Sequence, residues 1–328
     1  MIRTPVCGLL DIEVPIIQAG MSTFTSAELV AAVTNAGGLG SLGAANRPVD
    51  DLRRQLARIA DLTGGSFAVN HLVTVMDEET FALTLEARPR VISMALDHPH
   101  DYVKRAHDAG ALVMHQVTTV QQARDAAERG VDLIVAQGGE AGGYGGTVAT
   151  MTLVPQVVDA VRPLPVIAAG GITDGRGMAA ALMLGAQGVN IGTRFLATVE
   201  SPIADGHKQA ILAGKSEDVI KADVWNDIMP LPGAAGYFTV PRALRTPFLD
   251  EWQARREDAR REQKRLQGEV AAAAQSGRFH ELMPFAGQSS GAISSIIPAA
   301  DVVHGIASEA EELLRGAAAR FVVQGRSL

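Results

Sequence analysis

The sequence has a single cysteine, Cys7, and few aromatic residues, which make up 4% of its 328 residues. One cysteine cannot form a disulfide within the chain, so nothing points to an oxidising compartment. No apolar run reaches the roughly 18 residues that a membrane-spanning helix requires. The N-terminus also lacks the apolar region and cleavage site of a signal peptide. These absences predict a cytoplasmic protein with no membrane partner.

Basic residues are too few and too scattered to form a nucleic-acid surface. Acidic residues number 36 against 29 lysines and arginines, which gives a formal net charge of −7. We therefore expect no nucleic-acid partner. The histidines show no spacing typical of a metal site, and we predict no bound metal. The hydrophobic fraction of 47% is ample for a large core. The expected partner is a small-molecule substrate.

Glycine, in contrast, is abundant, and it punctuates a repeated pattern over residues 14–213. Short apolar runs alternate with amphipathic stretches, as in successive βα units. The runs are apolar throughout, which indicates strands of a parallel sheet that are buried on both faces. Eight such runs can be counted, at 14–19, 39–43, 66–72, 90–96, 111–116, 131–137, 164–170 and 187–192.

Eight units in about 200 residues favour a closed (β/α)8 TIM barrel over the alternative, an open doubly wound sheet. Residues 1–213 would form the main part of this barrel, with helices at 26–37, 49–61, 119–130 and 175–186. Residues 214–298 form an irregular segment that includes a long charged helix from Phe248, and we expect it to act as a lid. A terminal helix within 299–328, starting near Ala299, would pack back on the barrel.

The active site of a TIM barrel lies at the carboxyl ends of its strands. Polar or small residues stand at these ends in an otherwise apolar pattern, and a buried polar side chain needs a partner. In chain order they are Gln18, Ala19, Gly20 and Met21, then Asn70 and His71, then His115 and Gln116, then Gln137 with the glycine loop that contains Gly142 and Gly143.

Two glycine turns follow the last two strands. Gly170 and Gly171 leave backbone amides uncovered, and a helix that opens near Asp174 points its positive end toward them. Gly192 and Thr193 offer further amides and a hydroxyl. A single such turn could equally serve helix packing, but loops at these two places often hold a phosphate. The pair predicts a phosphate site that belongs to a nucleotide-type cofactor.

Several strings resemble the nitronate monooxygenase (2-nitropropane dioxygenase) family, which includes flavin-dependent enoyl-ACP reductases and NAD(P)H:quinone reductases. The strings are "PIIQAGM", "NAGGLGSLG", "FAVNHL", "VAQGGEAGGYGGT", "PVIAAGGITDGRGMAAALMLGAQGVNIGTRFL" and the late "GQSSG". The resemblance covers residues 5–215, with a looser echo at 286–320, and is most specific over 168–195.

This resemblance implies an FMN-binding TIM barrel with a helical lid. It places the flavin contacts at Gln18, Ala19, Gly20, Met21, Asn70, Gln116, Gln137, Gly142, Gly143, Gly170, Gly171, Gly192 and Thr193. The implied activity is oxidation of alkyl nitronates with O2. The alternatives are reduction of a quinone, an enone or an enoyl thioester with NADH or NADPH, and a flavin-binding protein without turnover. A homodimer is one arrangement that the sequence leaves open.

The glycine loop "GGEAGGYGGT", at 138–147, departs from the family at one position. The resembling enzymes carry a catalytic histidine in the pattern EAGGH, and Tyr144 stands in its place here. A phenol with a pKa of about 10 is a poor base but a good hydrogen-bond donor. Tyr144 is therefore a candidate donor to the substrate, or only a wall of the flavin pocket, whereas Glu140 is expected to brace the loop.

His71 and His115 are candidate replacements for the missing histidine. Adjacent residues of a strand point to opposite sides, so if Asn70 and Gln116 face the flavin, these histidines face the helices. Trp225, Tyr237 and Phe238 lie in the irregular segment and serve either core packing or the substrate wall.

A rival resemblance, to the IMP dehydrogenase and GMP reductase group, requires a nucleophilic cysteine after the sixth strand. No cysteine follows that strand in this sequence.

Overall fold

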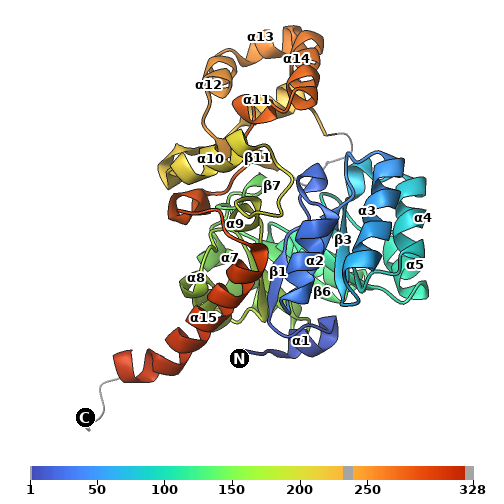
Figure 1. Cartoon of the computed structure of the whole chain (residues 1–328), viewed down its shortest axis with the longest axis vertical. Helices are drawn as coiled ribbons and strands as arrows, with labels where there is room; N and C mark the ends of the chain where they lie inside the picture. Colours follow the sequence, from blue (N-terminus) through green and yellow to red (C-terminus); the bar gives the residue numbers. More distant parts are fainter. Residues whose placement is uncertain (1, 232–238, 322–328) are drawn as a thin grey trace.

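Eight parallel strands form the centre of the molecule, in the order β1-β9-β8-β6-β5-β4-β3-β2 (Figure 1). A bridge between Ile17 and Leu39 joins the first and last strands of this order. The expected (β/α)8 TIM barrel is therefore confirmed. The structure is a computed structural model that describes residues 2–231 and 239–321.

Each barrel strand overlaps one of the eight apolar runs. The strands are β1 (Ile16–Gln18), β2 (Gly40–Gly43), β3 (Phe67–Leu72), β4 (Val91–Ala95), β5 (Leu112–Val117), β6 (Leu133–Gln137), β8 (Val166–Ala169) and β9 (Gly188–Ile191). The helices between them are α2 (Ala27–Asn35), α3 (Val49–Leu62), α4 (Glu78–Glu86), α5 (Tyr102–Asp108), α6 (Val120–Glu128), α7 (Thr150–Val161) and α8 (Gly175–Met183). Before residue 214 the chain also forms α1 (Pro5–Leu10), α9 (Thr193–Leu196), α10 (Asp205–Ala213) and the 3₁₀ turns η1 (Ser22–Phe24) and η2 (Val73–Val75).

Local signals start several of these helices where the sequence suggests. The side chains of Ser26, Thr119 and Asp174 accept hydrogen bonds from backbone amides in the first turns of α2, α6 and α8. Such caps satisfy amides that a helix leaves without an internal partner. The predicted helices at 26–37, 49–61, 119–130 and 175–186 are confirmed as α2, α3, α6 and α8.

The inside of the barrel is apolar at the amino-terminal end of the strands. Ile17, Leu39, Ala68, Val91, Met114, Leu133, Val135, Ile167 and Ala169 form one buried cluster with Val6, Cys7 and Leu10 of α1. Helix α1 thus closes this end of the barrel, and Cys7 is a buried thiol. A ligand of the barrel interior would therefore bind at the opposite, carboxyl-terminal end.

The C-terminal helix α15 (Ala299–Phe321) packs along the outside of the barrel against α8 and α2, as the red helix of Figure 1 shows. Val303 and Ala310 of this helix are fully buried in the outer core of the barrel. The start of the predicted terminal helix at Ala299 is confirmed.

The segment between α10 and α15 forms a cap at one end of the barrel (Figure 1). Its elements are η3 (Ser216–Asp218), β10 (Val219–Lys221), α11 (Asp223–Ile228), β11 (Val240–Leu244), α12 (Pro247–Ala254), α13 (Arg256–Arg261), α14 (Gln263–Gln275), η4 (Phe279–Glu281) and η5 (Gln288–Ala292). Strand β11 pairs antiparallel with β10 and with the short β7 (Gly143–Gly145) of the glycine loop. This three-stranded sheet attaches the cap to the barrel.

The prediction of one long charged helix from Phe248 is wrong. The chain forms three helices, with breaks at Arg255 and Glu262, where ψ is 44° and 13°. Trp252, Ala259 and Leu266, one from each of the three helices, belong to one buried cluster. Within the described ranges, no helix is long and apolar enough to cross a membrane.

Candidate active site

A ring of polar side chains replaces the apolar interior at the carboxyl end of the barrel strands. Because side chains alternate along a strand, these residues point inward above the apolar floor. The ring consists of Ser41, Asn70, Ser93, Gln116, Gln137 and Asn190. Asn70 and Ser93 are neighbours in register, and the Asn70 Nδ2 donates to the Ser93 Oγ at 3.2 Å. Three of the six, Asn70, Gln116 and Gln137, were predicted from the sequence.

Some polar atoms of this ring are buried and have no partner. The Ser41 Oγ, Gln137 Oε1 and Asn190 Oδ1 make no hydrogen bond within the part of the chain that is described. A buried polar atom without a partner costs free energy, so a native site with three of them is expected to bind a polar ligand there.

Gln18, a predicted cofactor residue, has a structural task in this fold. Its side chain accepts from the Ser41 amide at 3.0 Å and donates to the Ser41 carbonyl at 3.1 Å. The backbone bonds between β1 and β2 end at Leu39, so the glutamine amide continues the ladder by two residues. Its polar atoms therefore close the barrel, a role that only the spatial pairing of the strands reveals.

The loops that follow the strands touch one another around this mouth. A Cβ on Gly20 would lie 2.2 Å from the Asn70 Cβ, and one on Gly192 would lie 3.3 Å from the Met21 sulfur. A Cβ on Gly142 would lie 2.6 Å from the Gly287 nitrogen. The predicted residues of the first, third, sixth and eighth units thus come together, with Ala19 between Gln18 and Gly20.

The turns after β8 and β9 present free backbone amides, as predicted. No hydrogen bond from the amides of Gly171, Gly192 or Thr193 is found among the described residues. The Thr193 Oγ1 accepts from the Gly287 amide at 2.9 Å, and the Thr173 Oγ1 donates to the Ser289 carbonyl at 3.4 Å. The late "GQSSG" turn therefore bridges the two loops beside these free amides.

The expected contribution of the α8 N-terminus to this site is wrong. The Gly175 amide donates to the Glu309 Oε2 of α15 at 2.7 Å, and the amides of Arg176 and Gly177 donate to Asp174. Two carboxylates already satisfy the positive end of this helix. The packing of α15 against α8 brings Glu309 to the Gly175 amide. The sequence around Gly175 does not indicate this contact.

Glu140 braces the glycine loop, as expected. Its carboxylate accepts from the Thr150 amide at 2.9 Å and from the Thr150 hydroxyl at 2.9 Å. Thr150 begins α7, so the carboxylate also stabilises the positive end of that helix.

The two candidate histidines lie on the outside of the strands. The His71 Nε2 is 2.9 Å from the Thr84 Oγ1 of α4, and its ring packs edge-on against Phe81. His115 is fully buried and shares its side of β5 with Val113 and Val117, which belong to the outer core. Burial lowers the pKa of His71 to about 4 and that of His115 to about 3. Both therefore face the helices, away from the inner polar ring.

Tyr144 lies opposite Pro241 in the β7–β11 pair. Its ring packs into the cap beside Phe285, with ring centroids 6.4 Å apart. Burial raises the pKa of Tyr144 to about 12, and a hydrogen bond from the Trp225 side chain offsets part of this rise. The phenol is therefore neutral at physiological pH, which makes it a donor and excludes it as a base. Trp225 is itself buried in the cap core, and Tyr237 and Phe238 lie outside the described residues.

The comparisons with known proteins agree with this geometry. The family model described as nitronate monooxygenase matches residues 3–82 and 73–309. The chain belongs to the nitronate monooxygenase family.

Relatives in this family carry different names. A (3aS,4S,5R,7aS)-5-hydroxy-7a-methyl-1-oxo-octahydro-1H-indene-4-carboxyl-CoA dehydrogenase of Mycobacterium tuberculosis is 38% identical over 86% of this chain and 75% of its own length. A probable nitronate monooxygenase of Staphylococcus saprophyticus is 33% identical over 68% of this chain and 76% of its own. The solved structure of FabK from Thermotoga maritima aligns with a TM-score of 0.88 and 33% identity, over 98% of this chain and 100% of FabK. This nitronate monooxygenase family member is therefore an oxidoreductase.

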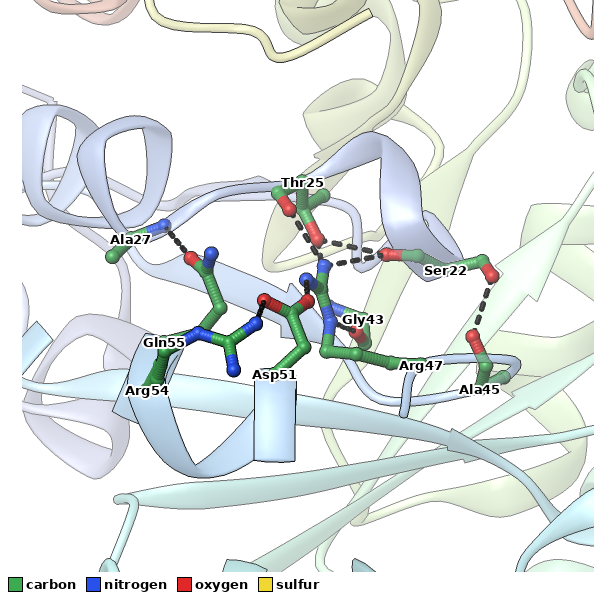
Figure 2. A network of polar contacts seen from close by, with 9 residues as sticks. All are labelled: Ser22, Thr25, Ala27, Gly43, Ala45, Arg47, Asp51, Arg54 and Gln55. Carbon is green, nitrogen blue, oxygen red and sulfur yellow. Dashed lines mark hydrogen bonds and ion pairs between the residues drawn. The ribbon is translucent and has the colours of Figure 1, made fainter. Parts of the chain in front are cut away.

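A buried arginine holds the loop after β1 in this family member. Figure 2 shows that Arg47, which follows β2, reaches three backbone carbonyls. The guanidinium donates to the Gly43 carbonyl at 2.9 Å, to the Thr25 carbonyl at 2.7 Å and to the Ser22 carbonyl at 3.3 Å. It also pairs with Asp51 and holds the pKa of that carboxyl below its ordinary value, against the effect of burial. Arg47 thus positions the turn that carries Gly20 and Met21. This role of Arg47 was not identified from the sequence.

Two cations of the cap were also missed. The Lys221 Nζ donates to the Gly145 carbonyl at 2.9 Å and to the Val240 carbonyl at 3.0 Å. The Arg242 Nε donates to the Gly139 carbonyl at 2.9 Å. Burial lowers the pKa of Lys221 to about 8, Arg242 lowers it further, and Asp223 opposes the shift. Their place beside the glycine loop depends on the β10–β11–β7 sheet, and no motif signals it.

Proposed function

We propose that the enzyme is an FMN-dependent oxidoreductase that oxidises alkyl nitronates with O2. The family resemblance implies the flavin, and the barrel mouth fits it in two respects. The free amides of Gly171, Gly192 and Thr193 suit a phosphate, as loops at these places often do. The unpartnered atoms of Gln137 and Asn190 suit the polar edge of a flavin ring.

One observation supports a nitronate as substrate, namely that the residue in the family's histidine slot is a neutral phenol. With its pKa raised to about 12, Tyr144 cannot remove a proton from carbon at neutral pH. A nitronate is already an anion and needs no such base. Bound FMN would supply the electron-accepting group, while the protein binds and orients the substrate against it. The Tyr144 hydroxyl would donate to a substrate oxygen and exclude water with its ring.

Reduction of an enoyl thioester is the second candidate, and a relative at 38% identity supports the substrate class, because its name gives a CoA thioester as substrate. A neutral phenol would also suit the proton donor that such a reduction needs. This candidate requires NADH or NADPH as the electron source.

Anaerobic stopped-flow mixing distinguishes the two functions. We expect propyl-2-nitronate to bleach the flavin absorbance within the dead time or shortly after it. NADH and NADPH should bleach it far more slowly than the nitronate does. Rapid bleaching by a nicotinamide, with none by the nitronate, would replace the proposal with the thioester reductase. Protein that purifies colourless, and gains no thermal stability from added FMN, would refute flavin dependence.

Substituting Tyr144 tests its role as a donor. We expect Tyr144→Phe to raise the KM for propyl-2-nitronate about tenfold, because one hydrogen bond to a charged group is lost. Tyr144→His should restore much of this loss, since an imidazole N–H can also donate. The KM and the far-UV circular dichroism of both variants would be measured. Kinetics equal to those of the parent in both variants would mean that Tyr144 is only a wall.

A further inference from the structure

The small sheet that attaches the cap has two distinct faces. Residues directly opposite each other in adjacent strands point to the same side, and neighbours along a strand alternate. Tyr144, Pro241 and Ala243 therefore share one face, and Ala243 and Tyr144 pack in the cap core. The other face carries Gly145, Arg242 and Lys221, because Lys221 is opposite Arg242 in register.

This second face points at the polar ring of the barrel. A Cβ on Gly145 would lie 3.0 Å from the Gln137 Oε1. The Gly145 carbonyl accepts from the Lys221 Nζ at 2.9 Å. The same residue, Gly145, therefore contacts both the Lys221 ammonium and the Gln137 side chain. The Gln137 Oε1 makes no hydrogen bond to any described residue.

Neither cation is paired with a carboxylate in the part of the chain that the structure describes. Among the described residues, no carboxylate lies within 4.0 Å of the Lys221 ammonium or the Arg242 guanidinium. Asp223 and Glu140 act on them only at longer range, and the Glu140 oxygens are bound to Thr150. Both cations are half-buried and stand next to each other. Two adjacent half-buried charges of one sign are unfavourable unless an anion joins them.

Donors remain for such an anion. Two N–H groups of the Lys221 ammonium donate hydrogen bonds to backbone carbonyls. The Nε–H and one Nη1–H of Arg242 do the same. One lysine N–H and the outer edge of the guanidinium are left. A guanidinium edge matches a planar group that has two oxygens.

We propose that Lys221 and Arg242 form a subsite for a planar two-oxygen anion, the nitronate group of the substrate. The inference deepens the proposed function and rests on it for the identity of the substrate. The subsite supplies the charge that holds the anion at the mouth. The alternative is that both cations only brace the glycine loop through its carbonyls.

Binding of an unreactive isostere tests the subsite without turnover. Isobutyrate has the branched chain and the planar two-oxygen group of propyl-2-nitronate and cannot be oxidised in its place. Its Kd would be measured calorimetrically on the flavin-loaded protein, with inorganic phosphate and coenzyme A titrated in parallel. We expect Lys221→Met and Arg242→Met each to raise the isobutyrate Kd at least about tenfold. Lys221→Arg should recover most of the loss.

Lys208 offers a matched control. It is a buried lysine of α10 whose Nζ donates to the Thr198 and Val199 carbonyls at 2.9 and 3.4 Å, so it braces a loop in the same manner. Lys208→Met should leave the isobutyrate Kd unchanged. An equal loss in this variant would assign the effect to general destabilisation and overturn the proposal.

Two further results would also overturn the subsite. One is an unchanged isobutyrate Kd in Lys221→Met. The other is that Lys221→Met and Arg242→Met weaken the binding of phosphate or coenzyme A but not that of isobutyrate. This result would assign the two cations to a phosphate group. Failure of the proposed function looks different. Isobutyrate binding that depends on Lys221, in a protein that does not oxidise propyl-2-nitronate, would refute nitronate oxidation and leave the anion subsite in place.

Discussion

Gly170→Val is expected to lose FMN, with a Kd for the flavin at least about a hundredfold higher, or about 3 kcal/mol. Gly170 has a φ of +99°, which a β-branched residue adopts only with strain. Its Cβ would also lie 3.0 Å from the Gly138 carbonyl oxygen and 3.1 Å from the Ala141 nitrogen. The turn must move away from the glycine loop, and the Gly171 amide moves with it. Flavin content after purification and fluorescence titration of the apoprotein would measure the loss.

Gly130→Val controls for backbone strain alone. Gly130 has a φ of +82°, but a Cβ there would meet nothing within 4 Å, and it lies before β6 at the closed end of the barrel. We expect this variant to lose about 1–3 kcal/mol of stability and to keep its affinity for FMN. If Gly170→Val binds FMN as tightly as the parent, the turn after β8 is not part of the cofactor site. Thermal unfolding of both apoproteins would separate a binding defect from a folding defect.

Acid should destabilise the enzyme well before its carboxylates are protonated. Burial lowers the pKa of His71 and of His207 to about 4, and that of His115 to about 3. A hydrogen bond to the Phe285 carbonyl opposes the shift of His207, and Asp77 opposes that of His71. The unfolded chain takes up protons at these imidazoles below pH 6.5, whereas the folded chain does so only near pH 4. The free energy of unfolding therefore falls as the pH falls from 6.5 to 4.

The expected slope is about 1.4 kcal/mol per pH unit for each histidine, or about 3 kcal/mol from His71 alone over this range. Urea unfolding at pH 7.5, 6.0 and 5.0 would measure it. His71→Gln should flatten the slope by about one third, because one proton fewer is taken up on unfolding. His304→Gln, on the exposed side of α15, should leave it unchanged. A free energy of unfolding that is constant from pH 6.5 to 5 would contradict the assignment of these histidines as neutral and buried.

Much of the barrel could be predicted because its signals are local. The eight apolar runs became the eight strands, and the caps at Ser26, Thr119 and Asp174 began their helices in the expected places. The alternation of side chains correctly placed His71 on the helix side of its strand. The flavin contacts themselves stay predictions, although the structure gathers their residues at one end of the barrel.

The cap could not be predicted to the same degree, because its elements depend on pairing between distant segments. The long helix expected from Phe248 is broken at Arg255 and Glu262, and neither residue is a glycine or proline that would have signalled a break. The Gln18 amide closes the barrel on Ser41, a role that the sequence does not indicate. The positive end of α8 resembles a phosphate site, but Glu309 of α15 occupies its first amide.

The sequence by itself determined the βα repeat, the positions of the strand ends, the glycine turns and the phenol at Tyr144 in place of a histidine. These follow from periodicity, from the backbone freedom of glycine and from the identity of one side chain, all of which act over a few residues. Only the tertiary structure decided that Lys221 and Arg242 stand beside the glycine loop. That arrangement exists because β11 pairs with both β7 and β10. The sequence of each segment by itself does not indicate which other segments it pairs with.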